Sequence, residues 1–157
     1  MKLIVWQKAM ELFKLVWQAA YVEGAIDFKL RAQFADAAQS VAANIAEGYG
    51  RRSAKEYIQY LYVALGSMGE TMTRALGLAR TGQISAVRFH EIDLIHYEVE
   101  NRLLRLIEKI EQKRDDGDWI NRIADDESEY LPETRSSPNA PTLHHSKTPP
   151  LQSLPYE

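Results

Sequence analysis

The residues best suited to chemistry are basic and aromatic, and they gather around one short glycine-containing segment. Arg51, Arg52 and Lys55 lie close together where we expect a helix to begin. The free backbone amides of a helix N-terminus, together with such cations, can receive a phosphate. Aromatic rings beside basic groups are the ingredients of single-strand nucleic-acid binding. The candidate nucleic-acid-binding residues are Arg51, Arg52, Lys55, Arg74, Arg80 and Arg88, and the candidate stacking residues are Tyr49, Tyr57 and Tyr60.

A second interpretation of the same arginines is that they pair within the chain. Glu47 and Glu56 stand close in sequence to Arg51 and Arg52, so ion pairs that fix the loop explain Arg51 at least as well. The tyrosines fit an apolar helix stripe as readily as a stacking surface. A salt-titrated binding assay distinguishes the two interpretations, because phosphate contacts strengthen as the salt concentration falls.

Four further polar residues lie on otherwise small or apolar helix faces. Asn44 and Glu47 are one helical turn apart, and so are Ser67 and Glu70. In an antiparallel helix pair these residues could form a buried hydrogen-bond network with Arg51 that fixes the register of the helices. We prefer this structural role to catalysis, because two carboxylates do not make an acid/base pair without a substrate pocket.

The histidines invite a metal interpretation that the spacing does not support. The zinc-protease pattern that begins at His90 would need a second histidine where the chain has Leu94. Asp93 and His96 supply the carboxylate-x-x-His pattern once, whereas a di-metal bundle needs it on two helices. His96 falls on an apolar stripe, where a hydrogen-bonded core histidine is expected. We therefore predict no metal, no cofactor and no enzymatic activity.

The elements that position these residues are helices. Residues 1–114 contain no proline and are rich in strong helix formers, and their apolar residues recur at steps of three and four. We expect helices at about residues 3–22, 28–47, 54–81 and 86–114. Four such helices with short connections predict an all-α fold, an antiparallel up-down four-helix bundle. The stripe that the first helix turns inward is Trp6, Ala9, Met10, Phe13, Val16, Trp17, Ala20 and Tyr21.

Local signals mark the ends of these helices. Asp27 and Ser85 are expected N-caps of the second and fourth helices. Ser53 and Glu56 match a capping box at the start of the third helix, in which both side chains bond free amides. Gly48 is expected to end the second helix in a left-handed turn.

Proline and charge are segregated along the chain. All six prolines lie after residue 131, and residues 115–157 hold 3 basic against 9 acidic residues. Residues 1–114 hold 16 basic against 13 acidic residues, a net charge of +3. The last segment has too few branched apolar side chains to offset its ordering entropy. We predict one folded domain over residues 1–114 and an acidic, proline-rich disordered tail over residues 115–157.

The cellular compartment is inferred from two absences in the sequence, that of cysteine and that of long apolar stretches. The chain has no cysteine, which excludes a disulfide framework and fits a reducing environment. No stretch approaches the about 20 apolar residues of a membrane span. We expect a cytoplasmic protein with no membrane partner.

The third helix carries more apolar surface than a monomeric bundle needs. One stripe can face the core, and a second could face another subunit, because exposed apolar patches rarely go unused. A single wide buried stripe explains the pattern almost equally well. Two glycines within four residues indicate close packing or a required contact, since helix-interior glycine costs up to about 1 kcal/mol. The candidate oligomer-interface residues are Ile58, Tyr62, Leu65, Gly66, Gly69 and Leu76.

One run of residues is similar to a known family. The stretch Asn-Ile-Ala-Glu-Gly-Tyr-Gly-Arg at residues 44–51, with Gly-Ser-x-x-Glu at residues 66–70, resembles the four-helix-bundle family of 23S rRNA intervening-sequence proteins. The likeness covers roughly residues 3–112. It implies a ring-like homopentamer, and it implies a relation to the accessory proteins of diversity-generating retroelements, which bind nucleic acid and a reverse transcriptase.

The pattern and the resemblance together predict a non-enzymatic, homo-oligomeric scaffold or adaptor. Its expected partners are further copies of itself, RNA or DNA, and a nucleic-acid enzyme such as a reverse transcriptase. A net charge of only +3 on the body is weak beside the basic accessory proteins. The alternative is therefore a purely protein-binding assembly module in which the arginines pair internally.

Overall fold

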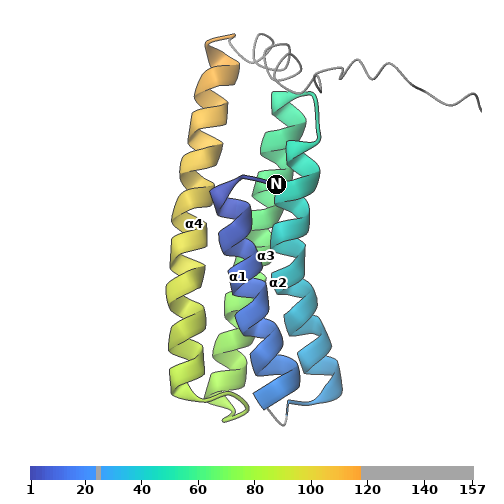
Figure 1. Cartoon of the computed structure of the whole chain (residues 1–157), viewed down its shortest axis with the longest axis vertical. Helices are drawn as coiled ribbons and strands as arrows, with labels where there is room; N and C mark the ends of the chain where they lie inside the picture. The colour runs from blue at the N-terminus through green and yellow to red at the C-terminus, as the bar shows by residue number, and fades with distance from the viewer. Residues whose placement is uncertain (24–25, 118–157) are drawn as a thin grey trace, which may run out of the picture.

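The computed structural model of the chain describes residues 1–23 and 26–117, and these residues form helices and short connections. The helices are α1 (Ile4–Trp17), α2 (Phe28–Tyr49), α3 (Ala54–Arg80) and α4 (Ala86–Asp115), with a π-helical segment η1 (Gln18–Glu23) after α1. The described residues contain no strand, and the all-α prediction is confirmed (Figure 1). The disorder predicted for the tail falls, from residue 118 onward, outside the described residues.

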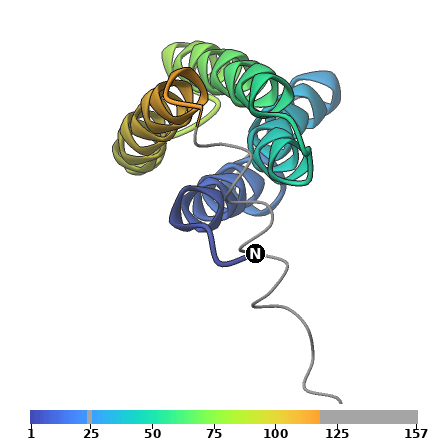
Figure 2. The same cartoon turned by 90° about the horizontal axis from the view of Figure 1, so that it is seen from above.

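The helices form the expected antiparallel bundle. Each helix packs against its neighbour in sequence, and α1 also packs against α4, which closes the bundle (Figure 2). We call the end that holds residues 50–53 and the C-terminus of α4 the loop end. We call the opposite end, where η1 leads into α2 and residues 81–85 join α3 to α4, the turn end (Figure 1).

Two of the three predicted helix caps are present. Asp27 Oδ1 accepts hydrogen bonds from the backbone amides of Lys29, at 2.9 Å, and Leu30, at 3.3 Å. Ser85 Oγ accepts one from the amide of Arg88 at 3.1 Å. The predicted capping box is wrong: Ser53 occupies the N-cap position of α3 with extended backbone, but its side chain makes no cap hydrogen bond.

The end of the first helix differs from the expected regular helix. Its last six residues adopt the wider π-helical turn of η1. Ala19 and Ala20, adjacent in sequence, are both buried there, whereas Tyr21 is directed outward. The wider turn thus changes which side chains the end of this segment presents to solvent.

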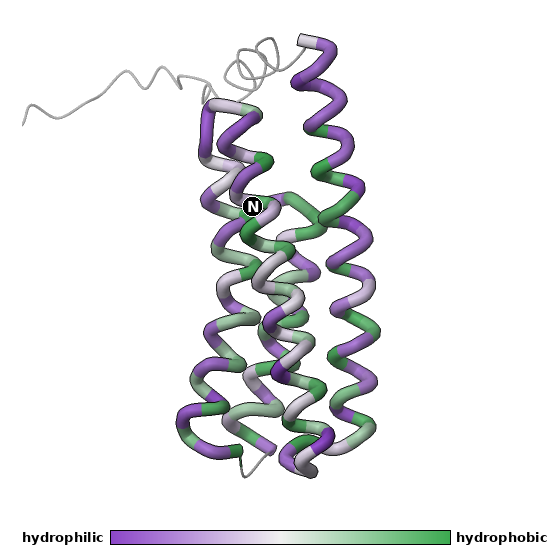
Figure 3. Tube along the Cα trace, turned by 180° about the vertical axis from the view of Figure 1, so that it is seen from behind, coloured by the Kyte–Doolittle hydropathy of each residue, from purple (hydrophilic) through white to green (hydrophobic). Residues whose placement is uncertain are grey.

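The core runs along the bundle axis and is built from the inward stripes of all four helices. Its largest fully buried side chains include Leu12, Phe34, Leu61, Met68 and Ile92. Apolar residues alternate with hydrophilic ones along every helix, as a helical period requires (Figure 3).

His96 is the buried core histidine that its position on the stripe predicted. Its Nε2 lies 3.1 Å from the carbonyl oxygen of Met68, so the ring nitrogen donates to a backbone acceptor on α3. This bond satisfies a polar group that would otherwise be costly to bury.

Gly48 has a different role from the one its sequence position suggested. The prediction of a left-handed turn is wrong, because α2 continues to Tyr49 and Gly48 lies inside it. A Cβ atom at Gly48 would lie 2.8 Å from Tyr57 Cδ2 and 2.8 Å from Tyr60 Cβ. The missing side chain therefore lets α2 and α3 approach each other closely at the loop end.

Candidate functional site

The first candidate residue at the loop end, Arg51, is held within the chain. Its guanidinium Nη2 donates to Glu47 Oε1 at 2.5 Å and to Tyr60 Oη at 2.6 Å. Tyr60 Oη in turn donates to Glu47 Oε1 at 2.8 Å. The guanidinium carbon also lies 4.8 Å from the centre of the Tyr60 ring. The ion-pair interpretation of Arg51 is therefore confirmed.

Within the trio of Arg51, Glu47 and Tyr60, the positive charge of the guanidinium is paired with the negative charge of the carboxylate. The hydrogen bond from Tyr60, and then that from Arg51, hold the pKa of the Glu47 carboxyl below its usual range. The hydrogen bond to Glu47 raises the pKa of Arg51. Both groups stay ionised at neutral pH, and the carboxylate offsets most of the positive charge of Arg51 at the loop end.

Two other predicted cations at this end face solvent. Arg52 and Lys55 are exposed, on either side of the N-cap residue Ser53. Lys55 makes no ion pair within residues 1–23 and 26–117. Lys55 therefore supplies accessible positive charge beside the start of α3.

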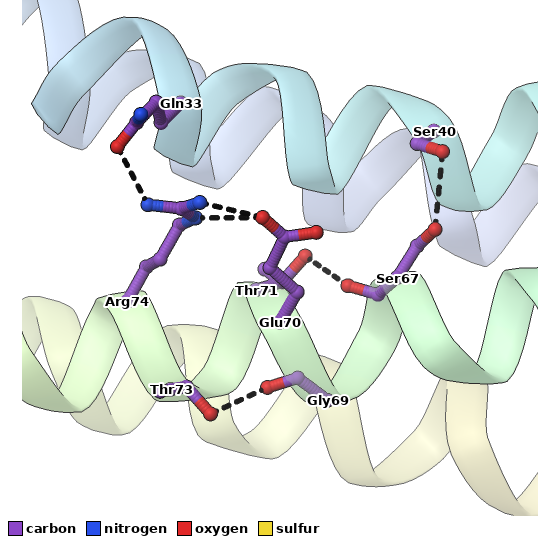
Figure 4. Close-up of polar contacts among 8 residues, drawn as sticks. All are labelled: Gln33, Ser40, Ser67, Gly69, Glu70, Thr71, Thr73 and Arg74. Carbon is purple, nitrogen blue, oxygen red and sulfur yellow. Dashed lines mark hydrogen bonds and ion pairs between the residues drawn. The ribbon is translucent and has the colours of Figure 1, made fainter. Parts of the chain in front are cut away.

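Two of the predicted cations of α3 and α4 are held within the chain, as Arg51 is. Arg74 donates from Nε and Nη2 to Glu70 Oε1, at 3.1 and 2.6 Å, and from Nη1 to Gln33 Oε1 at 2.9 Å (Figure 4). Arg88 forms ion pairs with Glu23 and Glu91, and only 17% of its side chain is exposed. Three of the six predicted nucleic-acid-binding residues, Arg51, Arg74 and Arg88, are thus engaged with carboxylates.

The six residues also do not form one surface. Arg51, Arg52 and Lys55 lie at the loop end, whereas Arg80 and Arg88 lie at the turn end. From the rise of an α-helix, the length of α3 separates the two groups by about 40 Å. Arg80 is exposed and joins no ion pair in the described part of the chain.

The four residues predicted to form one buried polar network do not do so, and they divide instead among three separate contacts between α2 and α3. Ser67 Oγ lies 3.0 Å from Ser40 Oγ (Figure 4). Asn44 Nδ2 also donates to Ser40 Oγ, at 3.0 Å. Glu47 instead joins Arg51 and Tyr60, and Glu70 joins Arg74 and Gln33. The bridging positions are Gln33, Ser40 and Glu47 on α2, facing Arg74, Ser67 and Tyr60 on α3.

These three contacts recur every seven residues on both helices. A heptad spacing keeps them on one seam while the two helices run in opposite directions. A shift of one residue would separate all three pairs at once, so the seam specifies the register of α2 against α3. The structural role expected for Asn44 and Ser67 agrees with this geometry, and Glu47 is exposed rather than buried.

A cluster at the turn end was not recognised in the sequence. Trp17 lies between two rings, with ring-centre distances of 5.9 Å to Phe13 and 4.3 Å to Tyr21. The guanidinium carbon of Arg31 lies 5.3 Å from the ring centre of Tyr21 and 5.1 Å from that of Phe28. We call Trp17, Tyr21, Phe28 and Arg31 the aromatic cluster.

The aromatic cluster could have been found only in part from the sequence. Phe13, Trp17 and Tyr21 recur every four residues, which indicates one helix face. The predicted inward stripe includes all three, yet Trp17 is 47% and Tyr21 is 39% exposed, so the prediction is wrong for these two residues. The approach of Arg31 to the rings depends on how α2 packs against η1, for which the sequence carries no simple signal.

The predicted oligomer-interface residues are placed unevenly. Ile58 is buried in the core, so its assignment to a surface is wrong, and Leu65 is half-buried. Tyr62 and Leu76 are exposed. Gly66 and Gly69 are exposed too, and a Cβ at either position would meet no atom within 4 Å. The close helix approach within the chain is therefore at Gly48 and not at these glycines.

The remaining features concern metals, membranes and cavities. The described residues contain no group of three side chains that could hold a metal ion, and none of their helices combines the length and hydropathy needed to cross a bilayer. A depression of about 240 Å³ lies between the start of α2 and the end of α3, lined by Leu30, Arg74, Gly77, Leu78, Thr81 and Gln83.

Comparison with known proteins adds a relationship to these features. The family model described as 23S rRNA-intervening sequence protein matches residues 1–105. Among solved structures, the chain is similar to a protein of unknown function from the S23 ribosomal protein family of Bacteroides thetaiotaomicron, with 26% sequence identity and a TM-score of 0.61. The match covers 66% of this chain and 97% of that protein. No curated protein matches the chain.

Proposed function

Because the chain belongs to the family of 23S rRNA-intervening sequence proteins, we propose that it is a homo-oligomeric scaffold or adaptor without catalytic activity. Its partners would be further copies of itself and either a nucleic acid or a nucleic-acid enzyme such as a reverse transcriptase. The proposal that the chain forms a homo-oligomer rests on the exposed apolar residues on the outer side of α3 and α4.

This outer surface continues along both helices. On α3, Tyr62, Gly66, Gly69 and Leu76 recur at helical spacing and face solvent. On α4, the exposed apolar residues include Leu94, Tyr97 and Leu104, and Tyr97 is 68% exposed. Tyr62 Oη donates to Glu111 Oε1 at 3.2 Å, which places this side of α3 next to α4. Exposed apolar residues that recur at helical spacing on neighbouring helices often mark a protein interface.

A second copy is the occupant that we propose for this surface. The glycines leave room for the side chains of another subunit at a helix that is otherwise well packed. Five copies are expected, the stoichiometry that the family resemblance implies. Association would bury the exposed leucines and tyrosines and so gain the hydrophobic free energy that the monomer forgoes.

The assembly is tested by adding bulk at the glycines. Gly66→Leu and Gly69→Leu should leave the helical content intact, because a side chain there meets no atom of its own chain. Both variants should lower the sedimentation coefficient, because leucine would clash with the neighbouring subunit. An unchanged sedimentation coefficient in both variants would contradict this interface.

Nucleic-acid binding rests on the exposed cations. Lys55 and Arg80 are exposed, and a ring of subunits would repeat them several times. Repetition matters because the body carries a net charge of only +3 per chain. The test is binding of a single strand over a salt titration, in which the affinity should rise steeply as salt falls. Absence of binding at low salt would reject this part of the proposal.

One observation favours the second candidate, a purely protein-binding assembly module. Arg51, Arg74 and Arg88 already have carboxylate partners within the chain. A module of this kind would assemble normally and would bind no RNA or DNA at any salt concentration. The two measurements above, sedimentation and salt-titrated binding, therefore separate the two candidate functions.

The depression between the start of α2 and the end of α3 is not built as a small-molecule site. The depression of about 240 Å³ is smaller than the roughly 300 to 1,000 Å³ of typical small-molecule sites. Its one charged lining residue, Arg74, is already bonded to Glu70 and Gln33.

A further inference from the structure

We propose that the aromatic cluster, formed by Trp17, Tyr21, Phe28 and Arg31, is a stacking site for the bases of a single-stranded nucleic acid. The inference rests on the proposed function and names its binding site. It places that site at the turn end, on the side of the bundle where α1 and η1 meet α2, and not at the loop-end arginines.

The rings are available for stacking. Trp17 is 47% exposed and Phe28, the first residue of α2, is 73% exposed. Trp17 and Tyr21 lie 4.3 Å apart with their planes tilted by 31°. A base that settles on such rings buries apolar area on both partners, and every base has a flat face that suits this contact.

Arg31 is held differently from the arginines that join ion pairs. Arg51, Arg74 and Arg88 each bond to a carboxylate. Arg31 forms no ion pair with any of the described residues, and its guanidinium lies over the rings of Tyr21 and Phe28. Its Nε is buried and has no hydrogen-bond partner. The cluster therefore carries a positive charge that no carboxylate within the described residues neutralises.

A positive charge fixed between ring faces suits a chain of bases and phosphates. The outer nitrogens of the guanidinium can bond a phosphate while the rings take the adjoining bases. Lys14 lies one helical turn before Trp17, is exposed, and joins no ion pair in the described segments. It could contact the next phosphate along the strand.

The geometry favours a single strand over a duplex. Bases in a duplex are stacked on each other, so their faces cannot reach the rings, whereas bases in a single strand are free to do so. An acidic peptide could satisfy Arg31 but would leave the rings exposed. The test therefore compares ligands that share the charge and differ in the presence of bases.

The experiment uses the full chain and a fluorescent oligothymidylate. The variant is Phe28→Ala, at a residue so exposed that its removal should not disturb the core. The control is Val87→Ala, which removes a 71% exposed apolar side chain at the start of α4, near the same end. Sedimentation of both variants checks that assembly is unchanged. A further variant, Arg31→Gln, removes the positive charge of the aromatic cluster.

We expect Phe28→Ala to weaken oligothymidylate binding at least about fivefold, the lower end of what loss of a stacking ring costs. Arg31→Gln should weaken binding and reduce its salt dependence. Val87→Ala should bind like the parent protein. An abasic strand of equal length should bind the parent protein more weakly than oligothymidylate does. Its affinity for Phe28→Ala should equal its affinity for the parent protein, because it has no bases to stack.

A spectroscopic readout locates the contact. In a protein that carries Trp6→Phe and Trp119→Phe, Trp17 is the remaining tryptophan, and a stacked base should quench its fluorescence. Strand binding without this quenching, and with unchanged affinity in Phe28→Ala and Arg31→Gln, would overturn the inference and leave the proposed function intact. No strand binding at low salt would overturn both. If polyglutamate or an abasic strand displaced the fluorescent strand as well as unlabelled oligothymidylate does, the stacking site would also be overturned, because neither competitor carries bases.

Discussion

The loop end and the turn end each place an arginine over a tyrosine ring, and they differ in what completes the contact. At the loop end, Arg51 lies over Tyr60 and a carboxylate, that of Glu47, bonds to both. At the turn end, Arg31 lies over Tyr21 and a second ring, that of Phe28, takes the place of the carboxylate. The first arrangement neutralises its cation, and the second leaves the charge for an outside partner.

The packing around the two arginines differs in the same sense. At the loop end, Gly48 lets α2 lie close against Tyr57 and Tyr60, so the rings there serve the contact between two helices. At the turn end, Trp17 and Phe28 keep much of their surface in solvent. The loop end is thus built for internal rigidity, whereas the turn end retains unused apolar area and charge.

The largest effect on this comparison is expected from Gly48→Ala. The new Cβ would stand 2.8 Å from atoms of Tyr57 and Tyr60, which must move. Such overpacking costs about 1–3 kcal/mol, and the better helix propensity of alanine offsets up to about 1 kcal/mol of it. We expect the free energy of unfolding in urea to fall, and the contact of Arg51 with Tyr60 to be disturbed.

Gly77→Ala is the matched control for this variant. Gly77 also lies inside a helix, but a Cβ there would meet no atom within 4 Å. The control should raise the free energy of unfolding by up to about 1 kcal/mol through helix propensity alone. If both variants were stabilised equally, close packing at the loop end would not be the reason for Gly48.

A smaller effect is expected at alkaline pH from the buried tyrosine of the loop end. Burial, reinforced by Tyr49, raises the pKa of Tyr57 to about 12, above the ordinary value of about 10. The folded protein keeps this proton where the unfolded chain has lost it. The contribution of Tyr57 is therefore complete below about pH 10 and is lost as the pH rises toward about 12.

The measurement is the unfolding free energy of the parent and of Tyr57→Phe at several alkaline pH values. Both proteins share every other titrating group, so the difference between them isolates Tyr57. We expect the parent to lose more stability than the variant between about pH 10 and 12. Parallel curves for the two proteins would show that the phenol is hydrated in the folded state.

The helices could be predicted from the sequence because the signals for them are local. Apolar steps of three and four placed all four helices, and Asp27 and Ser85 marked two starts through bonds to amides two or three residues away. The capping box failed although its residues are also local, because its hydroxyl makes no such bond. Caps depend on side-chain rotation as well as residue type.

The candidate site could be predicted only where partners are close in sequence. Arg51 follows Glu47 by four residues, just beyond the end of α2, so the sequence alone indicated that the two could pair. Arg31 on α2 meets Tyr21 on η1, and the contact depends on how these two elements pack against each other. Gly48 was misassigned for the same reason: the atoms that require a glycine belong to another helix.

The smallest effect is expected when the loop-end arginine, Arg51, loses its carboxylate partner and so comes to resemble Arg31 at the turn end. Glu47→Gln removes the charge that neutralises Arg51 while keeping a similar shape, so Arg51 becomes able to contact a phosphate. We expect tighter binding of oligothymidylate at low salt and a salt slope that increases by about 0.7, the value for one more phosphate contact on a single strand. Glu56→Gln is the control, because it makes the same charge change at the same end and leaves the pair of Glu47 and Arg51 in place. Equal strengthening in both variants would mean that only net charge matters, and that the partner of each arginine does not decide its availability.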